Sequence, residues 1–181
     1  MKRGRDASVL YLSVLDHPSQ WRTLAPSRTI IPELRRRWPD TEAVELSDRS
    51  TPNEVSLVDA MAPRFDIIVA GVFVRAASAS GRLDLSPSLV RLLQTMSHGA
   101  ERRGRPFVVA FFGNPYVAMS VPEVPSMLLA FDFSDSAESA VVRALAGETP
   151  IGGHLPIALP GLFPIGHGIV RPAGGSAAAK P

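Results

Sequence analysis

The hydrophobic residues of this chain form nearly unbroken runs, and helical patterns lie between them. The longest runs occur at residues 8–15, 66–74 and 107–112. Apolar stretches of this length, without regular polar alternation, are typical of strands that are buried on both faces. Phe107–Phe112 is the strongest of them, and Gly113, Asn114 and Pro115 end it. We therefore predict a central strand of a parallel sheet here, covered by helices on both faces.

Helical spacing of apolar residues links these strands. Ile30, Leu34 and Trp38 share one face of a predicted helix over residues 28–38, which Pro39 ends. The same reasoning predicts helices at residues 51–61, 86–103 and 134–145, and shorter strands at 43–46 and 126–133. Strands that alternate with helices in this way indicate an α/β fold.

Polar residues mark where two of the helices begin. Thr51 and Glu54 have the spacing of a capping box, with proline at the first helical position. Asn114 is a favourable N-cap, and Pro115 follows it. The second pair predicts a short helix over Tyr116–Ser120 directly after the central strand.

Proline and glycine dominate the sequence after Gly147 and exclude a helix there. His154–Leu159 is predicted as an irregular edge strand, where Pro156 is tolerated. Residues 172–181 hold no apolar side chain larger than Ala or Pro, so we expect a disordered tail after one domain over residues 1–171. The whole pattern predicts a three-layer, flavodoxin-like sandwich around a mostly parallel, six-stranded sheet.

Composition removes several classes of function. The chain has 181 residues, 45% of them hydrophobic, and a net charge of only +2. Its basic runs lie at the terminus or at helix ends without interleaved aromatic residues, which argues against nucleic-acid binding. No apolar run approaches the roughly 18 residues of a membrane span. The charged start without an apolar core indicates no secretory signal, so we expect a cytoplasmic location if the chain is free-standing. If it comes from a longer precursor, we expect a periplasmic or secreted one.

Motifs for cofactors and metals are missing from the sequence. No glycine-rich phosphate fingerprint follows any predicted strand, and no G-x-S-x-G elbow occurs. The chain has no cysteine, and its four histidines lack metal-ligand spacing. Ser78, Ser80 and Gly81 offer hydroxyls and amides to an anion, but a flexible surface loop is the favoured interpretation. We therefore expect no cofactor and no metal.

Carboxylates near the ends of the last strands are the remaining catalytic candidates. Asp132 is placed to point into the crevice at the sheet's carboxyl edge, whereas Asp135 is interpreted as the cap of the next helix. Glu123 lies in the loop after the central strand. Nothing in the sequence around these residues would raise a carboxyl pKa, as a general acid requires.

Several segments together resemble the C-terminal domain of glycoside hydrolase family 3. The similarity is to bacterial β-N-acetylglucosaminidase-like or β-glucosidase-like members. It is carried by F-F-G-N-P-Y (111–116), A-F-D-F (130–133), A-V-V-R-A-L-A-G (140–147) and the proline- and glycine-rich residues 150–168. The resemblance implies an α/β sandwich with five parallel strands and one antiparallel edge strand.

The resemblance also implies a partner and a limited role. In the family a (β/α)8 barrel carries the nucleophilic Asp, and this chain contains no such barrel. No catalytic residue of the family can be matched to a position here. The implied role is to buttress a barrel and wall one side of its sugar site, with carbohydrate and the barrel as partners and no activity alone. The alternative is a free-standing flavodoxin-like module that binds a small molecule or carbohydrate.

Four residues are the candidates for contact with the barrel or its sugar. They are Arg75, Arg82, Asn114 and Tyr116. All four follow the third or fourth predicted strand, and open α/β sheets bind ligands at the carboxyl ends of their strands. Capping by Asn114 and packing by Tyr116 are the structural alternatives.

Overall fold

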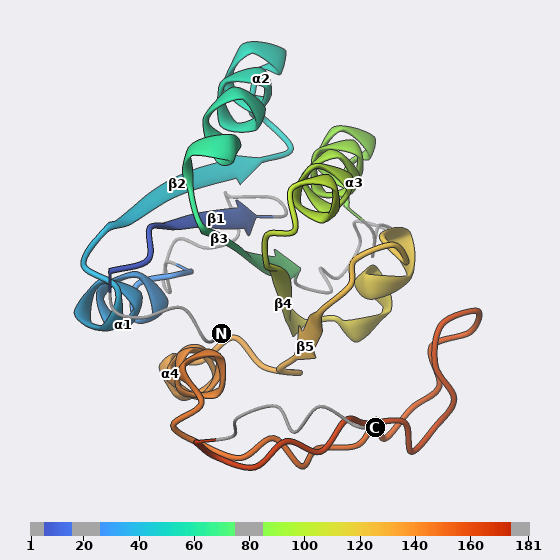
Figure 1. The fold of residues 1–181 in the computed structure, drawn as a ribbon. Helices are drawn as coiled ribbons and strands as arrows, with labels where there is room; N and C mark the ends of the chain where they lie inside the picture. Colours follow the sequence, from blue (N-terminus) through green and yellow to red (C-terminus); the bar gives the residue numbers. More distant parts are fainter. Residues whose placement is uncertain (1–5, 16–25, 75–84, 175–181) are drawn as a thin grey trace.

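A central parallel sheet lies between two layers of helices (Figure 1). The computed structural model describes residues 6–15, 26–74 and 85–174. The sheet has the strand order β2-β1-β3-β4-β5, and every strand pair in it is parallel. Its strands are β1 (Val9–Leu15), β2 (Thr41–Ser47), β3 (Ile67–Val74), β4 (Phe107–Gly113) and β5 (Met127–Leu129). The predicted α/β sandwich is therefore confirmed.

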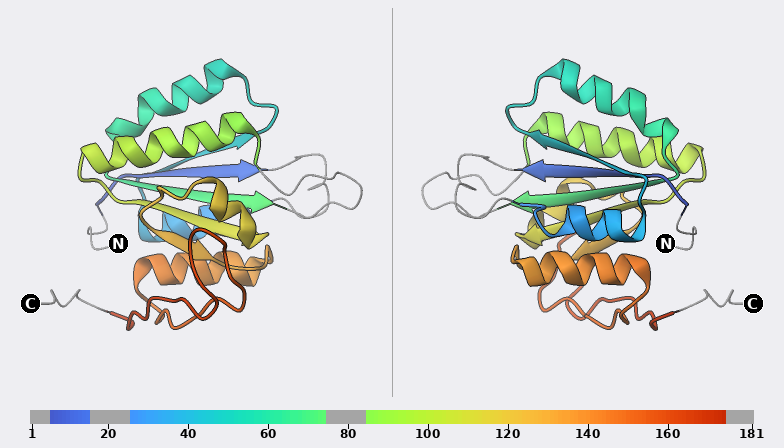
Figure 2. Two further views of the ribbon diagram at one scale, coloured as in Figure 1. Left: turned by 90° about the vertical axis from the view of Figure 1, so that its right-hand side faces the viewer. Right: turned by 90° about the vertical axis from the view of Figure 1, so that its left-hand side faces the viewer.

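The helices divide between the two faces of the sheet. They are α1 (Ile30–Arg37), α2 (Pro52–Met61), α3 (Pro87–Arg102) and α4 (Asp135–Ala146), with the 3-10 helices η2 (Ala62–Arg64) and η3 (Pro115–Ser120). Figures 1 and 2 show α2 and α3 on one face and α1 and α4 on the other. Thr51 forms the predicted capping box with Glu54. No described helix is long and apolar enough to cross a membrane.

Alternate residues of the buried strands pack into two separate cores. Leu10, Leu12 and Val14 of β1 pack on the α2 and α3 side. Val9, Tyr11 and Leu15 pack on the α1 and α4 side. This explains why the sequence shows an unbroken apolar run, because both faces of the strand are covered.

The prediction of a sixth, antiparallel strand is wrong for the described residues. His154–Leu159 does not join the sheet, and instead pairs loosely with the returning chain. The amide of Leu155 donates to the carbonyl of His167 at 2.8 Å, and that of Leu159 to the carbonyl of Phe163 at 2.8 Å. Pro156 and Pro160 interrupt the amides that a continuous ladder needs. Leu155 and Leu159 are still buried, so the segment is anchored by its side chains rather than by strand pairing.

A carboxylate from α4 is buried against the start of α1. Glu138 is only 1% exposed. It accepts hydrogen bonds from the backbone amides of Ser27 at 2.7 Å, Thr29 at 2.8 Å and Ile30 at 2.8 Å. These donors are amides of the kind that a helix start leaves unsatisfied, and the positive end of the helix dipole favours an anion there. Glu138 therefore joins α1 to α4 from within the core.

Three buried hydroxyl groups extend this network into the sheet. The Ser27 hydroxyl lies 2.7 Å from the Tyr11 hydroxyl and 2.7 Å from that of Ser13. Burial raises the pKa of Tyr11 far above its ordinary value, so the phenol stays protonated. Gly71 lies beside Ser13 on the neighbouring strand, and a Cβ there would collide with the Tyr11 hydroxyl. The glycine makes room for the tyrosine.

Replacing the buried carboxylate tests this arrangement. Glu138→Ala should lower the free energy of unfolding by at least about 3 kcal/mol, because three buried amides lose their acceptor. Urea unfolding measures the change. Glu148→Ala is the matched control: it removes a surface carboxylate that pairs with Arg37 of α1 at 2.6 Å, and should cost at most about 1 kcal/mol. Equal effects of the two variants would contradict the central role of Glu138.

Candidate functional site at the carboxyl edge of the sheet

The carboxyl ends of all five strands meet at one edge of the sheet (Figure 2). Open α/β sheets bind ligands outside this edge. The segments directly after β1 and β3 fall at residues 16–25 and 75–84, outside the described residues. Arg75 and Arg82 belong to the second segment, so their place at the edge stays a prediction. The described part of the edge is formed by the chain that leaves β2, β4 and β5.

Gly113 and Asn114 shape the turn after β4. Gly113 has a φ of 84°, and a Cβ there would collide with the carbonyl oxygen of Val74 at the end of β3. The amide of Asn114 donates to that carbonyl at 3.3 Å. The Asn114 side chain accepts from the amide of Tyr116 at 3.1 Å, so it caps η3. The capping interpretation of Asn114 is therefore confirmed, and a role in binding stays a prediction.

Tyr116 projects partly into solvent from the first turn of η3. Its side chain is 48% exposed, whereas Val117 and Ala118 beside it are buried. The structure thus brings Asn114 and Tyr116 together at the predicted edge. About half of Tyr116 is therefore accessible to solvent after the end of β4.

Phe131 is a second exposed aromatic residue at the same edge. It follows the last paired residue of β5, since the amide of Ala130 still donates to the carbonyl of Phe111 at 2.9 Å. Phe131 has a φ of 56°, in the left-handed region, and is 42% exposed. Sequence reasoning missed this residue, because an aromatic residue next to apolar ones resembles an ordinary strand position and was assigned to the strand over residues 126–133.

Asp132 presents a fixed carboxylate next to Phe131. It accepts from the Ser134 hydroxyl at 2.6 Å and from the amide of Phe133 at 2.7 Å. The hydroxyl of Ser134, followed by the amide of Phe133, holds the pKa of Asp132 below its usual value. The group is therefore ionised at neutral pH. It suits a hydrogen-bond acceptor better than a proton donor.

The expected capping role of Asp135 is wrong. Ser134 is the N-cap of α4, and its hydroxyl accepts from the amide of Ala137 at 3.4 Å. Asp135 is the first helical residue, and its carboxylate accepts from Nε and Nη2 of Arg28, each at 2.6 Å. That pairing lowers the pKa of Asp135. Glu123 lies earlier in the chain, between η3 and β5, where its backbone carbonyl accepts from the Ser97 hydroxyl at 3.0 Å.

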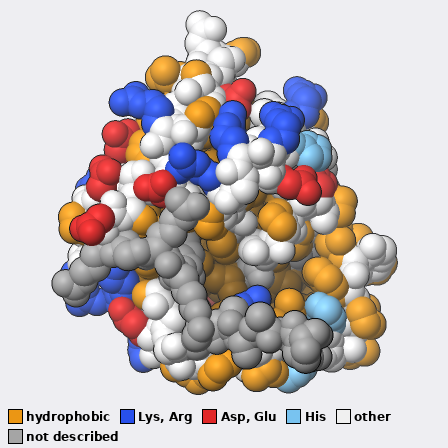
Figure 3. All heavy atoms as spheres, viewed as in Figure 1, with side chains coloured by type: hydrophobic (Ala, Val, Ile, Leu, Met, Phe, Trp, Pro, Cys, Tyr) orange, Lys and Arg blue, Asp and Glu red, His pale blue; other side chains and the backbone are white. Residues whose placement is uncertain are grey.

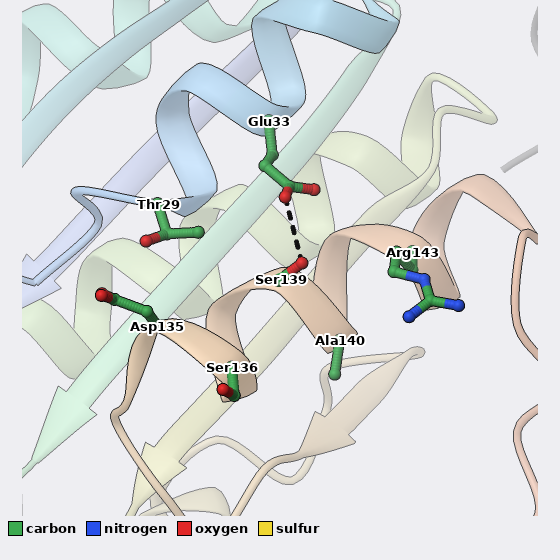
Figure 4. Close-up of a pocket in the computed structure, with 7 residues that line it drawn as sticks. All are labelled: Thr29, Glu33, Asp135, Ser136, Ser139, Ala140 and Arg143. Carbon is green, nitrogen blue, oxygen red and sulfur yellow. Dashed lines mark hydrogen bonds between the residues drawn. The ribbon is translucent and has the colours of Figure 1, made fainter.

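A shallow polar groove of about 400 Å³ separates α1 from α4 (Figure 4). It is lined by Thr29, Glu33, Asp135, Ser136, Ser139, Ala140 and Arg143. Glu33 of α1 accepts from the Ser139 hydroxyl of α4 at 3.0 Å and from Arg37 at 2.8 Å. Glu33 and Asp135, the acidic groups of the groove, thus already have protein partners, and the bond from Ser139 to Glu33 links α4 to α1.

The backbone amides at the start of α1 are already occupied by a side chain of the protein itself. In doubly wound sheets a helix start at this edge is a common phosphate site. Here the Glu138 carboxylate accepts from the amides that would bind the phosphate. Among the described residues no cluster of three or more His, Asp or Glu side chains could hold a metal ion.

The surface around the opposite, amino edge is mixed in charge. That edge faces the viewer in Figure 3, where basic and acidic side chains are interspersed over α2 and α3 and hydrophobic ones lie toward the lower right. Asp66 accepts there from the amide and hydroxyl of Ser8 at 3.2 and 3.1 Å and from Arg105 at 2.7 Å. The Ser8 amide and hydroxyl, followed by Arg105, hold the pKa of Asp66 below its usual value, and these contacts close the amino ends of β1 and β3.

Comparison with known proteins gives matches in structure only. No family model matches the sequence, and no curated protein matches it. A fungal multi-domain family 3 β-N-acetylglucosaminidase matches with a TM-score of 0.70 and 21% identity. A family 3 β-N-acetylglucosaminidase from Paenibacillus sp. str. FPU-7 matches with a TM-score of 0.62 and 19% identity. A β-glucosidase of saponin metabolism from intestinal bacteria matches with a TM-score of 0.61 and 14% identity.

The matches cover most of this chain but a minor part of the other proteins. They cover 91%, 78% and 93% of this chain, and 17%, 25% and 35% of the respective enzymes. The matched part is the C-terminal region of these enzymes. At these identities the comparison establishes the fold. The chain therefore has the fold of the C-terminal region of family 3 glycoside hydrolases, as the resemblance in sequence predicted.

Proposed function

We propose that this chain acts as the C-terminal domain of a family 3 β-glycosidase, alongside a catalytic barrel in the same precursor or in a separate chain. The observation that carries the proposal is the coverage of the structural matches. Nearly the whole chain, 91%, corresponds to 17% of the fungal β-N-acetylglucosaminidase. A chain of this length corresponds to one supporting domain of such an enzyme, and the catalytic barrel would lie in the larger part that this chain does not cover.

The chemistry of the carboxylates supports a non-catalytic role for this chain. A retaining glycosidase needs two carboxyl groups about 5 Å apart, and its acid needs a raised pKa. Asp132 and Asp135 lie near the described part of the carboxyl edge, and the pKa of each is lowered by a hydrogen-bond partner. Neither suits the proton donor. We assign the nucleophile to the barrel and a buttressing role to this domain.

The carboxyl edge is the face that we assign to the barrel and its sugar. Asn114 and Tyr116 are placed there by the turn after β4. Arg75 and Arg82 follow β3 in sequence, and their assignment to the same face rests on that position alone. Polar side chains at this edge would pair with sugar hydroxyls or with barrel side chains, and the rigid strands below would hold them in place.

The isolated chain should be inactive. It should not hydrolyse nitrophenyl β-glycosides of glucose, N-acetylglucosamine or xylose, because we assign the nucleophile to the barrel. Release of nitrophenol by the purified chain measures this. Turnover that survives purification and disappears when one carboxylate of this chain is changed would overturn the proposal and make the chain an enzyme in its own right.

Restoring a barrel by fusion or co-expression tests the assigned face. Tyr116→Phe and Arg82→Ala should weaken barrel association or raise KM for the glycoside, because each removes a polar group from the edge. Neither should change the free energy of unfolding by more than about 0.5 kcal/mol. Asp59→Ala on α2, away from this edge, is the control. If both edge variants match the parent in association and KM, another face is the functional one. Sugar binding by the chain without any gain from a barrel would favour the free-standing module.

A further inference from the structure

Two aromatic side chains stand open at the ends of neighbouring strands. The pairing of β4 with β5 ends at Phe111 and Leu129, and Gly113 and Phe131 each follow two residues after that last pair. Tyr116 follows the turn after Gly113. Phe131 and Tyr116 are 42% and 48% exposed. In contrast, Phe107, Phe111 and Phe112 of β4 are all buried. The exposed pair is thus concentrated where the chain leaves β4 and β5.

Phe131 adopts a backbone conformation that its side chain disfavours. Its φ of 56° lies in the left-handed region, where glycine is free of steric conflict and an aromatic residue is not. Glycine would adopt this φ, two residues after the end of β5, without strain. The phenyl group is only partly buried, since Phe131 is 42% exposed. Strained residues of this kind cluster at ligand sites, and an observed outlier is a legitimate starting point for assigning one.

A hydrogen-bond acceptor is fixed next to the ring. The Ser134 hydroxyl donates to one oxygen of the Asp132 carboxylate, and the amide of Phe133 donates to the other. Each oxygen keeps a further lone pair that can accept a hydrogen bond. Asp132 itself is exposed. The same Ser134 hydroxyl caps α4, so the carboxylate is held against a regular helix rather than on a free loop. The acceptor is therefore oriented before any ligand arrives.

We propose that Phe131 and Tyr116 form an aromatic platform for the apolar face of a pyranose ring, and that the Asp132 carboxylate accepts hydrogen bonds from its hydroxyl groups. This inference rests on the proposed function and names the sugar-contacting residues of that face. Aromatic surface combined with a few fixed polar groups is the usual composition of a small-ligand site. A neutral polyhydroxyl ring provides both donors and an apolar face, whereas the charge of Asp132 disfavours an anion.

Replacement of Phe131 by glycine separates binding from folding. F131G removes the ring and also relieves the strain at positive φ, so its melting temperature should equal or exceed that of the parent. F131Y keeps the ring and is the matched control for binding. I165A removes an exposed apolar side chain from the segment after α4 and controls for general loss of apolar surface.

The measurement is a titration of the ¹⁵N-labelled chain with N-acetylglucosamine or methyl β-glucoside, up to about 100 mM because a half-site binds weakly. In the parent, F131Y and I165A, amide shifts should change at Asn114, at Tyr116 and at residues 130–134. In F131G the affinity should fall at least tenfold, and D132N should weaken it as well. No localised shift in the parent, or unchanged affinity in F131G, would overturn the platform.

Two further outcomes distinguish this inference from the proposed function. If sugar shifts persist at the edge but no barrel gains activity or stability from the chain, the platform stands and the proposed function fails. If the chain assists a barrel, F131G weakens that association and no free sugar perturbs the edge, the proposed function stands. The ring is then a protein contact, which overturns the sugar assignment.

Discussion

The buried carboxylate of Glu138 is the interaction on which the α1 and α4 face of this domain depends. An unpaired carboxylate in the core would be costly, and three backbone amides at the start of α1 remove that cost. The contact links residues more than a hundred positions apart in sequence. It also positions Ser27, whose hydroxyl forms hydrogen bonds with the hydroxyls of Tyr11 and Ser13 in the central sheet. Surface ion pairs between Arg28 and Asp135 and between Arg37 and Glu148 close the same interface from outside.

The rigid sheet explains why the carboxyl edge can present a few side chains with precision. Four strands are nearly fully paired, and Gly113 allows the end of β4 to pass close against β3. The side-chain oxygen of Asn114 accepts the hydrogen bond that caps η3, and this fixes the first turn, which carries Tyr116. Ser134 fixes Asp132 in a similar way at the start of α4. The candidate site is thus built from turns whose geometry is set by the elements on either side.

Local patterns in the sequence were sufficient to predict most elements of the fold. β1, β3 and β4 were predictable because burial on both faces leaves an unbroken apolar run, and the capping box of α2 because both partners lie within four residues. Long-range contacts were not predictable. Glu138 looks like an ordinary polar residue on an amphipathic helix until α1 is placed against it. The prediction of an antiparallel strand at His154–Leu159 was wrong because its leucines are held by burial, and the segment does not pair with the sheet.

The candidate site was predictable only in part, for the same reason. Asn114 and Tyr116 were found because a glycine–asparagine–proline turn after a buried strand has a local signature. Phe131 has none, since neither its exposure nor its positive φ two residues after β5 can be read from the neighbouring sequence. Arg75 and Arg82 lie outside the described residues and stay predictions.

The central claim is that the carboxyl edge of this domain faces a catalytic barrel. Hydrogen exchange of the chain, alone and with a family 3 barrel expressed in trans, tests this claim most directly. The account predicts added amide protection at Gly113, Asn114 and Tyr116 and at residues 130–134, where the chain leaves β4 and β5. Protection confined to the opposite edge, around Asp40, Asp66 and Pro106, would contradict it.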